Sequence, residues 1–285
     1  MREQAPGAAV VVGGRVRGPV LLRNRAHVSR LLDVVLVGIL TRVSTPAAEP
    51  NPVVTGDPAF QNEVLEELAG AVNYRGWLVS LVEQQLGDDP LEVGSGTGEY
   101  AASLSAQGQN VTVSEAYGPS LRRLQERFAG DERVTVRELA VPADVEGGYS
   151  SVFAFNVLEH IPDDAAALAS MGRLVRPGGL VMVFVPAFTL LMSRFDRQVG
   201  HQRRYRAAEL RRLAEDAGLS VERLHHVNAP GFLAWLVGMR LLKGRPKDGP
   251  ALRVWDRLVV PPTRRLESWH RPPFGQSLFL VARRA

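Results

Sequence analysis

Three glycines at alternate positions, Gly94, Gly96 and Gly98, form the part of the sequence best suited to bind a ligand. Glu92 precedes them and Ser95 lies between them. Glycine lets the backbone approach a ligand where any side chain would clash. A short apolar run precedes this loop and a helical pattern follows it, so free N–H groups at the start of the helix face the loop. The loop is therefore predicted to bind a ligand that carries a carboxylate or a phosphate.

An acidic residue, Glu115, ends the next predicted strand about 20 residues further on. At this place an acid can accept hydrogen bonds from both hydroxyl groups of a ribose. The pair of features predicts a nucleoside ligand. By itself the pair does not distinguish a nicotinamide dinucleotide from S-adenosylmethionine.

Two further motifs favour one family. Residues 155–162 read Phe-Asn-Val-Leu-Glu-His-Ile-Pro, and residues 174–179 read Leu-Val-Arg-Pro-Gly-Gly. With the glycine loop and Glu115, these motifs make residues 60–190 resemble the class I S-adenosylmethionine-dependent methyltransferases, whose first motif is (Asp/Glu)-x-Gly-x-Gly-x-Gly. The resemblance implies S-adenosylmethionine as the cofactor. The residues expected to bind it are Glu92, Gly94, Ser95, Gly96, Gly98, Glu115 and Asn156.

The third predicted strand departs from the family pattern. Many relatives carry an acid after this strand that bonds the adenine amino group, but Leu139 occupies the corresponding position here. Two alternatives remain: Glu138 takes the role in a shifted register, or backbone groups and apolar contacts hold the adenine.

A second polar block follows the fifth predicted strand, from Ser193 to Tyr205. Its pattern, Asp-x-x-x-Gly-His-x-Arg-Arg-Tyr, resembles a subset of the class I enzymes that commonly accompany glycosyltransferases. That resemblance implies a small-molecule, saccharide or polyprenyl-linked acceptor. The block follows a strand at the carboxyl edge of the sheet, where ligands of open α/β sheets bind, so we expect it to form the acceptor site.

Three residues are candidates for catalysis. His201 can act as a general base because the ordinary pKa of histidine lies near neutrality. Glu159 and His160 lie on the loop that, in the resembling family, borders the methyl donor. For each histidine, the alternative is a purely structural role.

Arg203, Arg204 and Tyr205 are candidates for substrate binding. The two arginines could clamp a carboxylate or phosphate through forked hydrogen bonds. The alternative is that they pair with Glu209, Asp196 or other acids of the protein. Asp196 could orient His201 or neutralise an arginine.

The elements that position these residues alternate between strands and helices. Apolar runs at 90–93, 110–114, 133–138, 151–155, 180–185 and 278–282 predict strands. The alternation predicts an α/β fold, and the resemblance specifies a Rossmann-like, seven-stranded, mostly parallel sheet that ends in an antiparallel hairpin, with helices on both faces. Residues 186–276 are expected to form a helical insertion before the final strands. Helical spacing at 59–86 predicts two helices that break between Asn73 and Gly76.

Composition limits the remaining possibilities. The chain has 285 residues and a net charge of +4, it lacks cysteine, and its six histidines show no metal-binding spacing, so no disulfide or metal is expected. Proline-rich spacing predicts that residues 1–54 are a poorly ordered extension and linker and that 55–285 form the methyltransferase domain. The apolar run 31–40 is too short to span a bilayer, which favours a cytoplasmic protein. The arginines lack interleaved aromatics, so no nucleic acid partner is expected.

The segment 230–243 is apolar almost all round and flanked by basic residues. It could be a lid over the acceptor, a contact between two copies, or a peripheral membrane contact. A rival for the whole chain is a regulatory or pericyclic protein that binds S-adenosylmethionine without transferring its methyl group. The acceptor and the oligomeric state do not follow from the sequence.

Overall fold

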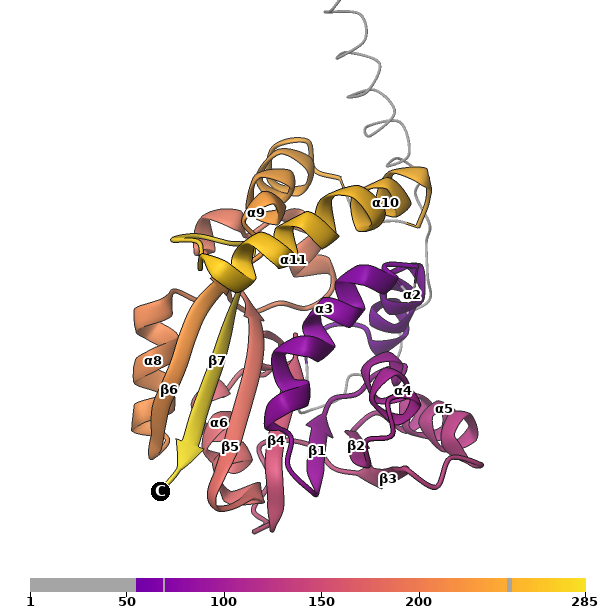
Figure 1. Cartoon of the computed structure of the whole chain (residues 1–285), viewed down its shortest axis with the longest axis vertical. Helices are drawn as coiled ribbons and strands as arrows, with labels where there is room; N and C mark the ends of the chain where they lie inside the picture. Colours follow the sequence, from indigo (N-terminus) through magenta and orange to yellow (C-terminus); the bar gives the residue numbers. More distant parts are fainter. Residues whose placement is uncertain (1–54, 69, 245–247) are drawn as a thin grey trace, which may run out of the picture. The chain divides into compact units, whose positions relative to one another are not determined.

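The computed structural model describes residues 55–68, 70–244 and 248–285, which form a seven-stranded sheet between helices (Figure 1). The predicted extension and linker, residues 1–54, lies outside the described residues. The strands are β1 (Pro90–Val93), β2 (Val111–Glu115), β3 (Val134–Glu138), β4 (Tyr149–Phe155), β5 (Val175–Pro186), β6 (Leu219–Val227) and β7 (Ser277–Arg284).

The strand order is β3-β2-β1-β4-β5-β7-β6. β1 to β5 are parallel, and β7 runs antiparallel to both of its neighbours, β5 and β6. This arrangement confirms the predicted Rossmann-like sheet. Because β1 to β5 run in one direction, their carboxyl ends meet at one edge, which is the edge where such sheets bind ligands.

The resemblance implied a seventh strand without giving its position, and the structure places this strand, β6, inside the segment 186–276 that was expected to be helical. It is an edge strand that pairs only with β7. Charged and imidazole side chains, among them Glu222, Arg223 and His225, interrupt its apolar alternation, which an edge strand tolerates. The residues between β6 and β7 form helices, so these two strands are antiparallel neighbours without a short hairpin turn.

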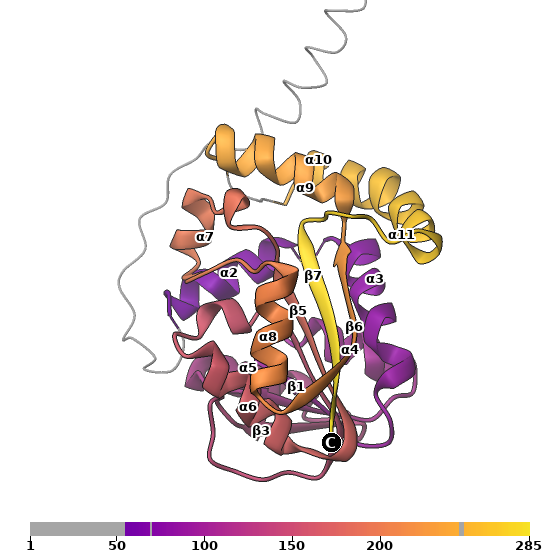
Figure 2. The ribbon, with the colours of Figure 1, turned by 90° about the vertical axis from the view of Figure 1, so that its left-hand side faces the viewer.

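Helices cover both faces of the sheet, and α8 and α3 lie on opposite sides of it in Figure 2. Side chains of β4 alternate accordingly. Val152 and Ala154 pack with α6 and α8, whereas Phe153 and Phe155 pack with α3 and α4. The helices over the sheet are α2 (Pro58–Leu68), α3 (Val72–Val82), α4 (Glu99–Ala106), α5 (Gly118–Phe128), α6 (Asp164–Leu174), α7 (Arg194–Gln198) and α8 (Ala207–Asp216), with short turns η2 (Glu83–Gln85), η3 (Leu158–His160) and η4 (Thr189–Leu191).

The predicted break between Asn73 and Gly76 is wrong, because α3 begins at Val72 and continues through both residues. The reason lies far along the chain. The buried carboxylate of Asp256 accepts hydrogen bonds from the backbone N–H groups of Asn73 at 2.9 Å and Tyr74 at 2.8 Å. A distant side chain thus caps the helix start, and local asparagine and glycine preferences do not decide it.

Two helical segments lie beyond the carboxyl ends of the parallel strands (Figure 1). α9 (Ala229–Trp235) continues into the π-helical turn η5 (Leu236–Leu241). α10 (Pro250–Val254), the π-helical turn η6 (Trp255–Val259) and α11 (Val260–Trp269) follow one another without a gap. We call these two segments the carboxyl-edge helices. None of the helices in the described part of the chain combines the length and apolar character needed to cross a membrane.

Candidate active site

The glycine loop joins β1 to α4. Gly94, Gly96 and Gly98 have positive φ angles of 68°, 54° and 76°, which favour glycine. A Cβ atom at Gly94 would lie 2.8 Å from Val157, and one at Gly96 would lie 2.7 Å from Leu65. The left-handed backbone conformation therefore favours glycine at all three positions, as the loop motif predicts.

Glu115, at the carboxyl end of β2, is held beside this loop. Its carboxylate accepts hydrogen bonds from the backbone N–H groups of Gly96 at 3.1 Å, Ala116 at 2.9 Å and Tyr117 at 3.2 Å. These bonds fix the orientation of the carboxylate. Its remaining lone pairs can accept hydrogen bonds from two ribose hydroxyls.

Glu92 lies under the loop and is buried. Burial raises its pKa to about 8, and the nearby charge of Glu115 contributes in the same direction. Its Oε2 atom is buried without a hydrogen-bond partner. Ser95 bonds the backbone carbonyl of Glu92 at 3.4 Å. A buried acceptor without a partner fits a ligand that brings a hydrogen-bond donor.

Asn156 follows β4 at the same edge of the sheet. Its φ of 53° is a turn conformation that asparagine tolerates, and its N–H donates to the carbonyl of Phe184 at 2.8 Å. Its side chain is exposed. On the adenine side, Glu138 is the Cα partner of Glu115 across β2 and β3, and Leu139 packs against the apolar core.

The three residues predicted to be catalytic lie together. Glu159 and His160 belong to the turn η3 after β4, and His201 comes from the segment after α7. Nε2 of His201 is 3.7 Å from Oε1 of Glu159. The rings of His160 and His201 meet edge to face, with centroids 4.7 Å apart. This cluster lies beside the glycine loop, since Val157 of the same turn contacts Gly94.

Asp196 holds the other side of His201. Its carboxylate lies 2.9 Å from Nδ1 of His201 and 2.7 Å from Nη2 of Arg204, and it accepts the N–H of Ser193 at 2.7 Å. Burial alone would raise the pKa of Asp196, but these partners hold it below its usual range. An ionised carboxylate only accepts hydrogen bonds, so Nδ1 of His201 carries the proton. Asp196 thus both orients His201 and neutralises an arginine, which combines the two predicted alternatives.

Glu159 has the opposite electrostatic behaviour. It is completely buried, and neither of its carboxylate oxygens has a hydrogen-bond partner. Burial raises its pKa to about 7, although the nearby His201 opposes that shift. Burial also lowers the pKa of His160 to about 3, and His201 acts in the same direction. His160 is therefore neutral at neutral pH.

Glu159, His160 and His201 could also hold a metal ion. One ligand atom from each of them lies within 4.8 Å of the others, and carboxylate and imidazole both bind divalent metals. The sequence-based expectation of no metal used spacing along the chain. His201 is distant from the other two residues in sequence, so that criterion could not detect this cluster.

The residues predicted to bind substrate form contacts within the protein. Arg204 is buried between Asp196 and the ring of Trp235, 4.8 Å away. Arg203 pairs with Asp164 at 2.6 Å, and the hydroxyl of Tyr205 donates to the same carboxylate at 2.9 Å. Of the three, only Arg203 keeps a substantial part of its side chain exposed, 30%, with which it could reach a ligand.

Residues before and within α2 also contribute to the site, which was not predicted. Thr55 donates from Oγ1 to the carbonyls of His160 and Gly200, both at 2.7 Å. Gln61 donates to the carbonyls of Thr55 and Val199 at 2.9 and 2.7 Å. These bonds join the loop of Glu159 to that of His201. No local motif marks Thr55 or Gln61, so only the fold reveals their position.

The model of the family described as "Methyltransferase domain" matches residues 64–224. The chain belongs to this family. The match covers the glycine loop, Glu115, the η3 turn and the Asp196–Tyr205 block. It confirms the predicted resemblance to S-adenosylmethionine-dependent methyltransferases, and with it S-adenosylmethionine as the cofactor.

Individual proteins agree with the family assignment. The ubiquinone biosynthesis O-methyltransferase of Paracidovorax citrulli is 34% identical over 37% of this chain and 46% of its own length. The chain spans about half the length of this and similar curated relatives. Geranyl diphosphate methyltransferase, solved with S-adenosylmethionine, shares the fold, with a TM-score of 0.54, 15% identity and coverage of 82% of this chain and 98% of that one. A methyltransferase of Thermotoga maritima also shares the fold, with a TM-score of 0.52 and 16% identity. The similarity covers 80% of this chain and 97% of that one.

Proposed function

We propose that this protein is a cytoplasmic enzyme that transfers a methyl group from S-adenosylmethionine to a hydroxyl oxygen of a small-molecule, saccharide or polyprenyl-linked acceptor. The observation that carries the proposal is the completely buried carboxylate of Glu159, without a hydrogen-bond partner, 3.7 Å from Nε2 of His201. A hydroxyl acceptor must lose a proton as its oxygen is methylated, and this pair can receive it.

His201 is the member of the pair that an acceptor can reach. Its side chain is 12% exposed, whereas those of Asp196 and Glu159 are fully buried. Asp196 keeps the proton on Nδ1, which leaves the lone pair of Nε2 to accept a proton from the hydroxyl. The imidazolium formed then lies between two carboxylates. Glu159 and Asp196 stabilise its charge, and His201 is the general base.

The donor side has a separate task. When bound, S-adenosylmethionine supplies a methyl group on a positively charged sulfur, which leaves readily as a thioether. Glu115 is placed to hold a ribose, and Gly94, Gly96 and Gly98 allow close approach of the ligand to the backbone. Alignment of the acceptor oxygen with the methyl carbon is then the main contribution of the protein.

Two observations support this choice of acceptor. Curated relatives that match the chain are named as O-methyltransferases, which favours an oxygen acceptor. The acceptor block resembles that of enzymes associated with glycosyltransferases, which favours a saccharide or a polyprenyl-linked molecule. Segment 230–243 exposes Leu233, Val237 and Leu241 near the same edge of the sheet, and we include a peripheral membrane contact there in the proposal.

Isothermal titration with S-adenosylmethionine and S-adenosylhomocysteine tests the donor site. We expect binding by the full chain and a loss of about 10-fold to 100-fold in affinity for Glu115→Ala, because a charged acceptor of two hydrogen bonds is removed. NADH serves as the control nucleotide and should not bind. Failure of both adenosyl ligands to bind would overturn the proposal.

Transfer of a labelled methyl group tests the reaction. The assay offers a catechol, a neutral sugar and a polyprenyl phosphate sugar as hydroxyl acceptors, with an amine of similar size as the comparison. We expect label in at least one hydroxyl acceptor and a lower rate for His201→Ala at unchanged donor affinity. Labelling of the amine alone would contradict the assignment of oxygen.

A further inference from the structure

The outer face of the carboxyl-edge helix from Pro250 to Trp269 is apolar although it faces solvent. Val254, Leu258, Leu266 and Trp269 have exposed fractions from 54% to 70%. Their spacing, with the exposed Pro262 between them, places them along one side of the helix. In a regular α-helix, a step of four residues is slightly more than one turn, so such residues move gradually around the helix. The π-helical turn η6 has more residues per turn, which brings these side chains back to the same side. The result is a continuous apolar stripe.

The opposite side of this helix fixes its orientation. Asp256 is buried and caps α3, and Val260 belongs to the apolar core. Glu267 accepts the N–H groups of Asn228 and Ala229, both at 2.9 Å. Rotation of the helix to bury the stripe would break these contacts, so the fold itself presents the stripe to the surroundings.

The other carboxyl-edge helix carries a similar stripe. Leu233, Val237 and Leu241 are exposed at steps of four on α9 and η5. Both helices lie at the end of the molecule that contains the carboxyl edge of the sheet (Figures 1 and 2). The apolar side chains of this end therefore come from two separate segments.

Positive charge accompanies the apolar side chains. Residues 229–275 contain nine lysines and arginines but three acids, whereas the whole chain has an excess of only four positive charges. Two of those acids, Asp256 and Glu267, are used in contacts with the backbone. Arg257, Arg264 and Arg265 are exposed on the same helix as the stripe.

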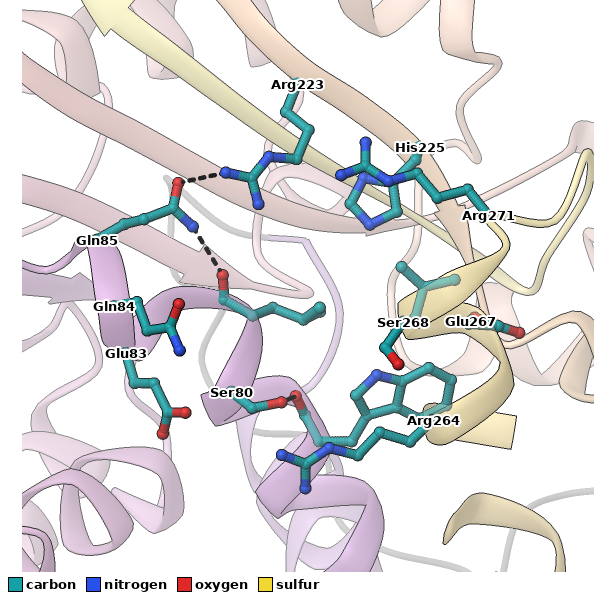
Figure 3. A pocket seen from close by; sticks show the side chains of 13 residues that line it. Ser80, Glu83, Gln84, Gln85, Arg223, His225, Arg264, Glu267, Ser268 and Arg271 are labelled. Atoms are coloured by element: carbon teal, nitrogen blue, oxygen red, sulfur yellow. Dashed lines mark hydrogen bonds between the residues drawn. The ribbon is translucent and has the colours of Figure 1, made fainter. Parts of the chain in front are cut away.

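The neighbouring pocket also has more cations than acids, with three arginines against Glu83 and Glu267. It lies between α3, β6 and α11, with a volume of about 450 Å³, and Figure 3 shows Arg223, Arg264 and Arg271 around it. Arg223 bonds the neutral side chain of Gln85 at 3.0 Å. Within the described residues, neither Arg264 nor Arg271 forms an ion pair with a carboxylate.

We propose that the carboxyl-edge helices dock on the surface of a membrane that contains anionic lipids. Leucine side chains and an exposed tryptophan, Trp269, would enter the boundary between headgroups and acyl chains, and the arginines would contact lipid phosphates. The excess of positive charge is the reason to choose an anionic bilayer over a second copy of the chain, because two identical basic faces repel each other.

This orientation also bears on the acceptor. Docking places the carboxyl edge, which holds the glycine loop and His201, near the bilayer, where a lipid-linked hydroxyl is within reach. The docking itself does not depend on the methyl-transfer proposal, and its test requires no turnover. A failed docking experiment and a failed methyl-transfer experiment can therefore be distinguished from each other.

Flotation with phospholipid vesicles tests the docking. The full chain is mixed with vesicles of phosphatidylglycerol and phosphatidylcholine, or with vesicles of phosphatidylcholine alone. We expect flotation with the anionic vesicles, and a fall of about tenfold or more for the double variant Leu258→Glu, Leu266→Glu, which removes apolar contact. Arg257→Glu should weaken flotation, as should about 0.5 M salt.

Matched variants at other surfaces are the controls. Val145→Glu changes an exposed apolar residue in the loop between β3 and β4, and Arg122→Glu repeats the charge change on α5. Both should float like the unaltered chain. Circular dichroism and S-adenosylmethionine binding show that each variant is folded.

Three results would overturn the proposal. These are absence of flotation with anionic vesicles, equal loss in the stripe and control variants, and a dimer in light scattering that Leu258→Glu, Leu266→Glu dissociates. The last result would assign the stripe to an interface between two copies.

Discussion

The proposed donor and acceptor sides of this site are built in different ways. On the donor side, Gly94, Gly96 and Gly98 shape the backbone, and Glu115 is held by N–H groups of nearby residues. On the acceptor side, Asp196 and His201 depend on side-chain contacts between segments that are distant in sequence. The donor side is local in sequence, whereas the acceptor side exists only after the chain has folded.

This difference predicts different responses to substitution. A site made by backbone conformation loses the contacts of one residue when that residue is changed. A buried side-chain network shares its charges, so removal of one member leaves other buried groups without partners. Variants of the acceptor side should therefore change both the stability of the protein and the rate of methyl transfer. Variants of the donor side should mainly change the affinity for S-adenosylmethionine.

The largest effect is expected for His201→Ala. Loss of a general base should lower kcat by about 10²-fold to 10⁴-fold, while the affinity for S-adenosylmethionine stays the same because the glycine loop is unchanged. Methyl transfer and isothermal titration measure the two quantities. His270→Ala, an exposed histidine after α11, is the control. Equal losses in both variants would remove His201 from the mechanism.

Arg203 and Arg204 are neighbours in sequence with different surroundings. Arg204→Ala leaves the buried carboxylate of Asp196 without its arginine and should cost about 3–5 kcal/mol of unfolding free energy. Arg203→Ala breaks a partly exposed pair with Asp164 and should cost about 1 kcal/mol or less. Urea denaturation measures both. Similar values would show that the Asp196 network is not a buried charge cluster.

The same contrast explains what could be predicted from the sequence. The central strands, the glycine loop and Glu115 depend on local pattern, and the structure places them as expected. The start of α3 was predicted wrongly because its cap, Asp256, lies far along the chain. The position of β6 was missed because an edge strand needs only partial apolar alternation.

For the acceptor side, the sequence indicates residues but not their contacts. It gave Arg203 and Arg204 equal roles, since two adjacent arginines look alike in sequence. Trp235 and the burial of Asp196 distinguish them only in the folded chain. The unpartnered carboxylate of Glu159 likewise has no sequence signal, because burial depends on the elements packed around it.

Glu92 is the buried acid of the donor side, and its substitution should make the stability of the protein depend on pH in a different way. Its pKa rises from an ordinary 4.5 to about 8 in the folded chain, so its contribution to stability is present below about pH 4.5 and is lost as the pH rises through 8. Glu92→Gln does not titrate. The free energy of unfolding of the variant, relative to that of the unaltered chain, should rise by a few kcal/mol between pH 4.5 and 8. Thermal unfolding measures this difference.

The matched control for this variant is Glu138→Gln, an exposed acid at the end of β3, for which no such gain is expected. Glu92→Gln should also weaken S-adenosylmethionine binding, because one carboxyl oxygen beside the loop is replaced by an amide nitrogen, which cannot accept a hydrogen bond. A pH-independent difference in stability would mean that Glu92 is already paired in the folded chain.

The smallest effect separates the two carboxylates beside His201. Asp196 has a lowered pKa and stays ionised, whereas burial raises the pKa of Glu159 to about 7. Below pH 7 Glu159 is protonated and no longer stabilises the imidazolium that forms on His201, so the rate should rise with pH and level off above about 7.

Glu159→Gln replaces the titrating carboxyl 3.7 Å from Nε2 of His201 with a neutral amide. The variant should therefore lose the rise in rate near pH 7 and keep the lower rate at both ends of the range. Rates from about pH 5 to about pH 9 at saturating donor measure this difference. An unchanged rise near pH 7 would mean that Glu159 does not assist the proton transfer.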